Sequence, residues 1–101
     1  MSSNTTSSMF FYIYVLESLK SFNRYIGYTS DLKKRMIEHK KGKSFATKHL
    51  LPIKLIYYEA CLNQEDAKRR ERYLKTTQGR RFLGLRLMEH KRQVKAFGSG
   101  G

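Results

Sequence analysis

Two side chains that could act on a phosphate group fall on the inward face of a strongly basic predicted helix. Residues 32–41 (LKKRMIEHKK) are typical of a helix in which Leu32 and Met36, four residues apart, share one face. Arg35 and His39 complete the i, i+3, i+4, i+7 set of that face, whereas the lysines point elsewhere. Breaking a buried ion pair costs about 3–5 kcal/mol. Arg35 is therefore expected to meet an anion.

A second predicted helix, residues 64–76, carries an inward-facing charge of the opposite sign. Ala67 and Leu74 define its apolar stripe at i and i+7, and Glu71 falls between them at i+4. Two interpretations are open at this point. Either Arg35 and Glu71 form an ion pair that positions one helix against the other, or Glu71 holds a divalent cation while Arg35 faces a phosphate.

Tyrosines supply a third chemical group. By strand alternation Tyr12 and Tyr14 share one face, and so do Tyr25 and Gly27. Packing between strands is one role for such rings. The other is chemical, because a phenol beside a cation can donate to a phosphate oxygen or give up its proton to activate a water. The missing side chain of Gly27 is expected to leave room for a substrate.

The elements that would position these groups follow from apolar patterning and capping residues. Aromatic and β-branched stretches predict strands, alternating stripes predict helices, and Asp31, Gly42, Pro52, Asn63 and Gly79 mark boundaries. The expected strands are residues 10–16, 24–28 and 53–61, and the expected helices are residues 32–41, 64–76 and 80–94. The order β-β-α-β-α-α predicts an α/β fold with a small, mostly antiparallel three-stranded sheet flanked by helices.

Charge and length limit the classes of function. Across 101 residues, 21 Lys and Arg against 8 Asp and Glu give a net charge of +13, which favours nucleic acid as the partner. The longest uncharged apolar run, residues 9–16, is far shorter than the roughly 20 residues of a membrane span. No membrane association is expected. The single cysteine, Cys61, fits a reducing compartment, and we expect a cytoplasmic protein.

The chain is expected to form one domain over residues 10–95. Residues 1–9 (MSSNTTSSM) are polar and predict a disordered tail. Residues 96–101 (AFGSGG) are typical of a flexible tail or an expression remnant.

An ordered set of motifs carries a family resemblance. Tyr12-Ile13-Tyr14 is followed by Tyr25-Ile26-Gly27, then by Arg35 ten residues after Tyr25 and by Glu71 in the next helix. Together these motifs resemble the GIY-YIG nuclease domain, which occurs in intron-homing endonucleases, some restriction enzymes and the excision-repair nuclease UvrC. The resemblance covers residues 10–87 and is strongest to small standalone members, similar to the N-terminal domain of UvrC.

The resemblance implies roles for five residues in a metal-dependent endonuclease. Tyr14 and Tyr25 match the motif tyrosines that orient or deprotonate the attacking water. Arg35 matches the arginine that stabilises charge on the phosphoryl oxygens. Glu71 matches the glutamate that binds one divalent cation, Mg²⁺ or Mn²⁺, and His39 matches a histidine that relays a proton; a merely packed histidine is the alternative.

The resemblance also has departures. Tyr12 replaces the first glycine of the motif, and no asparagine follows Glu71 by about a dozen residues. Thr76, Thr77 or Gln78 are the candidates to take its place. We therefore keep two functions: an endonuclease for DNA rather than RNA that recognises DNA shape, and a non-catalytic DNA- or RNA-binding module with the same fold. A protein partner could supply substrate choice. The predicted substrate-binding residues are Tyr12, Gly27, Lys33, Lys34, Lys40, Lys41, Lys43, Lys48 and His49.

Overall fold

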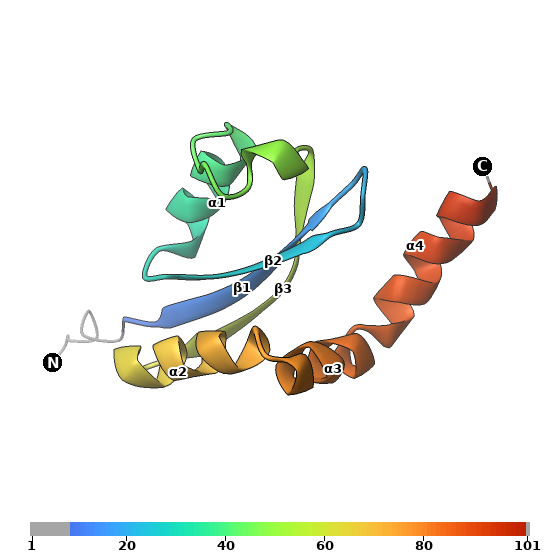
Figure 1. The fold of residues 1–101 in the computed structure, drawn as a ribbon. Coiled ribbons are helices and arrows are strands. Elements are labelled where there is room, and N and C mark those ends of the chain that lie inside the picture. The colour runs from blue at the N-terminus through green and yellow to red at the C-terminus, as the bar shows by residue number, and fades with distance from the viewer. Residues whose placement is uncertain (1–8, 101) are drawn as a thin grey trace, which may run out of the picture. The chain divides into compact units, whose positions relative to one another are not determined.

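The computed structural model describes residues 9–100, and its centre is a three-stranded sheet (Figure 1). The strands are β1 Phe11–Ser18, β2 Arg24–Thr29 and β3 Ile53–Cys61. Both pairings are antiparallel and β1 lies in the middle, in the order β2-β1-β3. The predicted fold class is confirmed, and the third strand has the predicted bounds.

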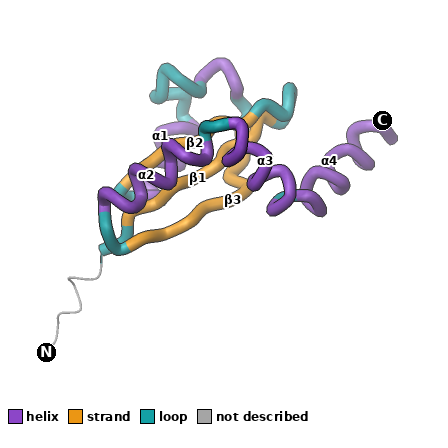
Figure 2. Tube along the Cα trace, turned by 60° about the horizontal axis from the view of Figure 1, so that its bottom comes forward, coloured by secondary structure: helices purple, strands orange, loops and turns teal. Residues whose placement is uncertain are grey.

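A helix and a short 3₁₀ turn lie between β2 and β3 along the chain, and the other helices come after β3 (Figure 2). The helical elements are α1 Leu32–Lys40, a 3₁₀ turn η2 Lys48–Leu50, α2 Gln64–Leu74, α3 Thr77–Arg86 and α4 Met88–Gly100. The chain forms two compact units whose boundary falls after Glu71, within α2. Among residues 9–100, we find no helix with the length and hydrophobicity needed to cross a bilayer.

Local capping explains where α1 begins and ends. The Asp31 carboxylate accepts a hydrogen bond from the Lys34 amide at 3.1 Å, so Asp31 is the N-cap. After Lys40, Gly42 adopts a positive φ of 74° and its amide donates to the His39 carbonyl at 3.0 Å. A residue with a side chain rarely adopts this φ, which is why the helix ends at the predicted glycine.

Helix α1 covers one face of the sheet. The core of this layer contains Tyr14 and Leu16 of β1, and Leu32 and Met36 of α1 pack against it. The predicted apolar stripe of α1 is therefore confirmed. It fixes the rotation of the helix and carries Arg35 and His39 along with it.

Helix α2 lies on the other face of the sheet (Figure 1), and polar contacts attach it there. The guanidinium of Arg70 donates two hydrogen bonds to the Glu59 carboxylate of β3, at 2.8 and 3.0 Å. The Gln64 amide donates to the Tyr28 hydroxyl of β2 at 3.0 Å. Ala67 is fully buried, as its stripe position predicts. These contacts set the position of Glu71, one residue after Arg70.

The prediction of a single helix over residues 80–94 is wrong, because the structure has two helices in this region, α3 and α4. Thr76 is the N-cap of α3: its hydroxyl accepts from the Gly79 amide at 3.1 Å and donates to the Tyr73 carbonyl at 2.6 Å. Gly79 thus lies in the first turn of α3 and does not separate helices. A Cβ at Gly79 would clash with the Tyr73 carbonyl, which explains the glycine.

The structure describes most of the predicted C-terminal tail but little of the predicted N-terminal tail. Helix α4 continues to Gly100, through most of the stretch for which we expected a flexible end. Of the predicted N-terminal tail, residues 1–8 lie outside the described residues.

Candidate active site

Tyr14 reaches its position because its neighbour on β2 has no side chain. Tyr14 pairs with Gly27 across the two strands, and its ring is 1% exposed. A Cβ built on Gly27 would overlap the Tyr14 ring and hydroxyl. The space at Gly27 therefore holds Tyr14 and not a substrate, which corrects the role that we expected for this glycine.

Replacing Gly27 by alanine is expected to destabilise the domain. The new methyl group must displace a buried, rigid ring, and such overpacking costs about 1–3 kcal/mol. Urea denaturation followed by circular dichroism should show a free energy of unfolding lower by that amount. Gly84→Ala is the control, because a Cβ at Gly84 meets nothing within 4 Å and alanine favours a helix. Equal stability of the two variants would contradict the close approach of Tyr14 to Gly27.

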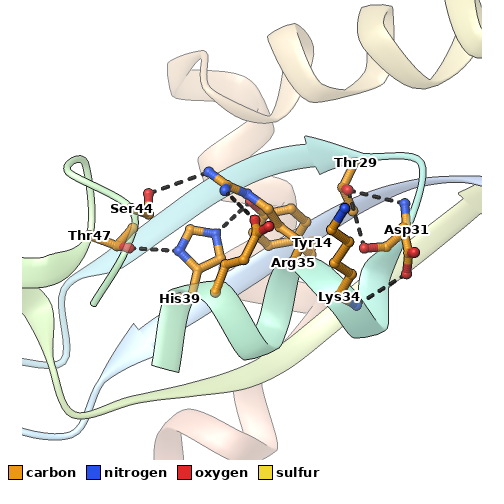
Figure 3. Close-up of polar contacts among 9 residues, drawn as sticks. Tyr14, Thr29, Asp31, Lys34, Arg35, His39, Ser44 and Thr47 are labelled. Carbon is orange, nitrogen blue, oxygen red and sulfur yellow. Dashed lines mark hydrogen bonds and ion pairs between the residues drawn. The ribbon is translucent and has the colours of Figure 1, made fainter. Parts of the chain in front are cut away.

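A buried chain of hydrogen bonds links Tyr14 to the loop after α1 (Figure 3). The Tyr14 hydroxyl lies 2.8 Å from His39 Nε2, and His39 Nδ1 lies 2.6 Å from the Thr47 hydroxyl. His39 and Thr47 are both 0% exposed. The inward orientation predicted for His39 is confirmed, and the ring contacts a specific hydroxyl on each side.

The pKa shifts allow protons to be assigned along this chain. Burial raises the pKa of the Tyr14 phenol above its usual value, although a hydrogen bond from Arg35 opposes the rise. Burial also lowers the pKa of His39, and the Arg35 charge lowers it further. A protonated phenol thus faces a neutral imidazole. We assign the phenol O–H as donor to Nε2, which leaves Nδ1–H to donate to Thr47.

Arg35 lies beside the same cluster. Its anionic partner is Glu38, whereas the ion-pair interpretation required Glu71. Within residues 9–100, the carboxylate that pairs with Arg35 is that of Glu38, one turn along α1, at 2.9 Å. Its other terminal nitrogen donates to the Ser44 hydroxyl at 3.3 Å. Hydrogen bonds to Tyr14 and then to Glu38 raise the pKa of Arg35. The Arg35 guanidinium is therefore half-buried beside the Tyr14 hydroxyl.

Tyr25 and Glu71 complete the set of residues suggested by the sequence. The Tyr25 ring lies 6.3 Å from that of Tyr14 and 5.8 Å from that of His39, measured between centroids. Glu71 is half-buried on α2; burial is the main cause of the raised pKa of Tyr14, and the negative charge of Glu71 adds a smaller contribution. The charge of Glu71 therefore acts on the same phenol that His39 and Arg35 contact.

The donor set fits a hard cation with few protein ligands. In residues 9–100, no three His, Cys, Asp or Glu side chains come together as a metal cage. Mg²⁺ usually keeps several waters and takes one or two carboxylates together with substrate phosphates. A single carboxylate such as Glu71 meets that requirement, whereas a structural zinc site would need four ligands.

The predicted substrate-binding lysines are exposed around α1 and the following loop. Lys33, Lys34 and Lys43 line one hollow together with Glu38, the partner of Arg35. Tyr12 lies in another hollow, where it contacts Tyr58 of β3 with ring centroids 6.0 Å apart. Lys33 and Lys40 line this second hollow too. The remaining predicted basic residues, Lys41, Lys48 and His49, are exposed.

Three residues of the site carried no predicted role: Glu38, Ser44 and Thr47. Glu38 and Ser44 hold Arg35, and Thr47 holds His39. Thr47 directly precedes Lys48 and His49, two of the predicted substrate-binding residues, but no role was predicted for Thr47 itself. Thr76, one of the residues considered in place of the absent asparagine, uses its hydroxyl to cap α3.

Comparisons with known proteins give a family and several relatives. The family described as "GIY-YIG catalytic domain" matches residues 10–87. The chain belongs to the GIY-YIG family. It is 36% identical over 85 residues to UPF0213 proteins of Streptococcus pyogenes serotypes M3 and M1, a match that covers 83% of this chain and 91% of each relative. No solved structure gives a significant match to the chain. The family is one of nucleases, so a nuclease-type function on nucleic acid is supported.

Proposed function

We propose that this GIY-YIG protein is a divalent-metal-dependent endonuclease that hydrolyses phosphodiester bonds in DNA, directed by DNA structure and not by base sequence. The observation that supports this most directly is the buried hydrogen-bond chain from Tyr14 through His39 to Thr47, with Arg35 beside the phenol. A proton acceptor already aligned on a protonated phenol is suited to general base catalysis. A purely structural tyrosine would not need a buried imidazole as its partner.

In this mechanism Tyr14 activates the water that attacks phosphorus. The phenol passes its proton to His39 Nε2, and the resulting phenolate oxygen takes a proton from the attacking water. The imidazolium formed at His39 keeps its Nδ1–H bond to Thr47. Tyr25, whose ring lies beside both Tyr14 and His39, helps to orient the water.

Charge that builds up on the phosphoryl oxygens is stabilised from two sides. Arg35 can turn one of its donors from Glu38 or Ser44 to a non-bridging oxygen. Glu71 would hold the cation, Mg²⁺ or Mn²⁺, which as a Lewis acid stabilises the leaving oxygen when bound. Lys33, Lys34 and Lys43 line the hollow beside Glu38 and bind the flanking phosphates.

Recognition of DNA shape follows from the kind of contacts available. Lysines bind the backbone and give affinity and register without reading bases. The net charge of +13 strengthens such contacts and makes them sensitive to salt. We therefore expect affinity to fall steeply with ionic strength, and we expect that any choice of sequence needs a protein partner.

The test is a cleavage assay on a matched set of substrates. Labelled continuous duplex, nicked, flapped and branched DNA, with RNA versions of each, are incubated with Mg²⁺, Mn²⁺ or EDTA. We expect cutting of the interrupted or branched DNA with either cation and none with EDTA. Tyr14→Phe protein prepared in the same way controls for contaminating nucleases. Tight binding without cutting in any metal would favour the alternative, a non-catalytic nucleic-acid-binding module.

A further inference from the structure

The loop between α1 and η2 folds into a tight turn that presents one aromatic side chain. The Ser44 carbonyl accepts hydrogen bonds from the amides of Thr47 at 3.1 Å and Lys48 at 3.0 Å. Phe45 and Ala46 are therefore the two central residues of a closed turn. The two hydrogen bonds define the backbone at Phe45, from which its side chain projects.

Both ends of this turn are attached to side chains of the candidate active site (Figure 3). Ser44 accepts from Arg35 at 3.3 Å, and Thr47 contacts His39 at 2.6 Å. Both hydroxyl-bearing residues are buried. Phe45 lies between them in the sequence, so the position of its ring is coupled to the positions of Arg35 and His39.

Phe45 is nevertheless 84% exposed, more than any other large hydrophobic residue among the described side chains. A single exposed aromatic residue is ordinary on a protein surface and carries no meaning alone. The placement beside catalytic side chains is what distinguishes Phe45. Lys48 Nζ lies over the ring, 5.4 Å from its centroid, which places a cation on one aromatic face.

We propose that Phe45 stacks on a nucleobase of the DNA next to the scissile phosphate, at a point where the duplex is interrupted. The proposal rests on the proposed nuclease function and adds how the substrate is chosen. Aromatic rings interleaved with cations are the usual platform for unpaired bases. A base inside a continuous duplex has both faces covered by its neighbours. A base at a nick, flap or branch has a free face, and only that base can stack on Phe45.

The neighbouring cations fit this occupant. Lys43 and Lys48 flank the turn and are both exposed, so they can bind the phosphates on either side of the stacked base. An apolar protein partner would bring no comparable negative charge to these two lysines. The charge around Phe45 therefore favours a nucleotide.

The experiment measures stacking and affinity without cutting. Flapped DNA with 2-aminopurine at the junction, and a continuous duplex with the same label, are titrated with protein in EDTA. The wild-type protein is expected to quench the fluorescence of the flap label. Phe45→Ala should abolish the quenching and weaken flap binding about 5- to 100-fold, since stacking on an aromatic side chain contributes 1–3 kcal/mol per base and 1.4 kcal/mol is tenfold. Binding of the continuous duplex should change less than about twofold.

Two further variants control for loss of apolar surface and for folding. Phe45→Trp keeps a stacking ring and should restore the quenching and the affinity. Leu62→Ala removes an exposed apolar side chain, 64% exposed, from a different loop and should leave flap binding unchanged. Flap binding by Phe45→Ala equal to that of the wild type, or an equal loss on both DNAs, would overturn the stacking role.

The outcomes separate this proposal from the nuclease proposal. Quenching that depends on Phe45 in a protein that never cuts DNA would keep the stacking site and remove the enzyme. Cutting of flaps by Phe45→Ala at the wild-type rate would keep the enzyme and remove the stacking site. Absence of DNA binding by the wild-type protein would remove both.

Discussion

Glu71→Gln is expected to reduce metal-dependent DNA cleavage by at least about 1000-fold while leaving DNA affinity nearly unchanged. The substitution keeps the size of the side chain and removes the carboxylate charge proposed to hold the cation. Loss of the cation forfeits several kcal/mol of transition-state stabilisation, and each 1.36 kcal/mol is tenfold in rate. Single-turnover cleavage of the preferred DNA, with Mg²⁺ and separately with Mn²⁺, measures the effect.

A second carboxylate of the same helix provides the control. Glu65 lies in the first turn of α2 and is exposed, so Glu65→Gln makes the same change of charge and should retain cleavage within about threefold. Binding of Mn²⁺, followed by electron paramagnetic resonance with uncut DNA present, should weaken in Glu71→Gln alone. If Glu71→Gln instead lowers the free energy of unfolding and leaves cleavage and Mn²⁺ binding intact, the carboxylate is structural.

Local sequence was enough to predict most of the fold, and the helix boundary misplaced at Gly79 depends on a contact beyond its immediate neighbours. Strand β3 and the start of α1 depend on neighbouring residues: an aromatic, β-branched stretch after Pro52 and the cap at Asp31. Gly79 was misread because a glycine usually marks an end. Its actual reason is the approach of the Tyr73 carbonyl, a contact that local propensity does not encode.

In the candidate site, local spacing predicted the orientation of side chains, whereas some of their partners depend on longer-range folding. Helical spacing predicted that Arg35 and His39 turn inward; this is confirmed for His39, which is fully buried against Tyr14, whereas Arg35 is half-buried and reaches Ser44 and Glu38. Spacing could not identify the partners. Arg35 pairs with Glu38 on its own helix. Thr47 lies eight residues after His39 and contacts it only because the loop after α1 folds back onto the helix. Which hydroxyl reaches a buried imidazole is decided by the path of that loop.

Gly27 carries the same lesson for substrate binding. A glycine in a strand indicates that something approaches the backbone, and the sequence alone left the identity of that group open. The structure supplies it as the Tyr14 ring. The glycine of the second motif thus serves the tyrosine of the first, so two motifs far apart in the chain act as one unit.

Tyr14→Phe is the second change with a large expected effect. It keeps the ring that packs against Gly27 and removes the hydroxyl that His39 contacts. We expect a decrease in the cleavage rate of about 100- to 10,000-fold, the contribution typical of a general base. Tyr58→Phe removes a hydroxyl from an exposed tyrosine of β3 that has no predicted role in catalysis or substrate binding, and it should stay within about threefold. Circular dichroism should show both variants folded, with Tyr14→Phe less stable by about 1–3 kcal/mol because His39 Nε2 loses its partner.

The pH dependence of cleavage distinguishes a proton relay from a merely structural hydroxyl. His39 accepts the phenol proton only when neutral, and its pKa is lowered from the ordinary 6.5, chiefly by burial. The wild-type rate should therefore persist below pH 6.5 and fall only as the pH drops through the lowered pKa of His39. The residual rate of Tyr14→Phe should lack this step. A wild-type rate that falls with a midpoint above 6.5 would contradict the relay.

Stability must be followed over the same pH range, because His39 links folding to protonation. A histidine with a lowered pKa in the folded state binds more protons when unfolded, so the free energy of unfolding decreases as the pH falls below 6.5. Unfolding would remove the activity of every variant together with its secondary structure. Protonation of His39 in the folded protein removes only the step that depends on Tyr14, and circular dichroism at each pH separates the two. Loss of the acid step in Tyr14→Phe, with folding intact, would therefore assign the proton acceptor to His39.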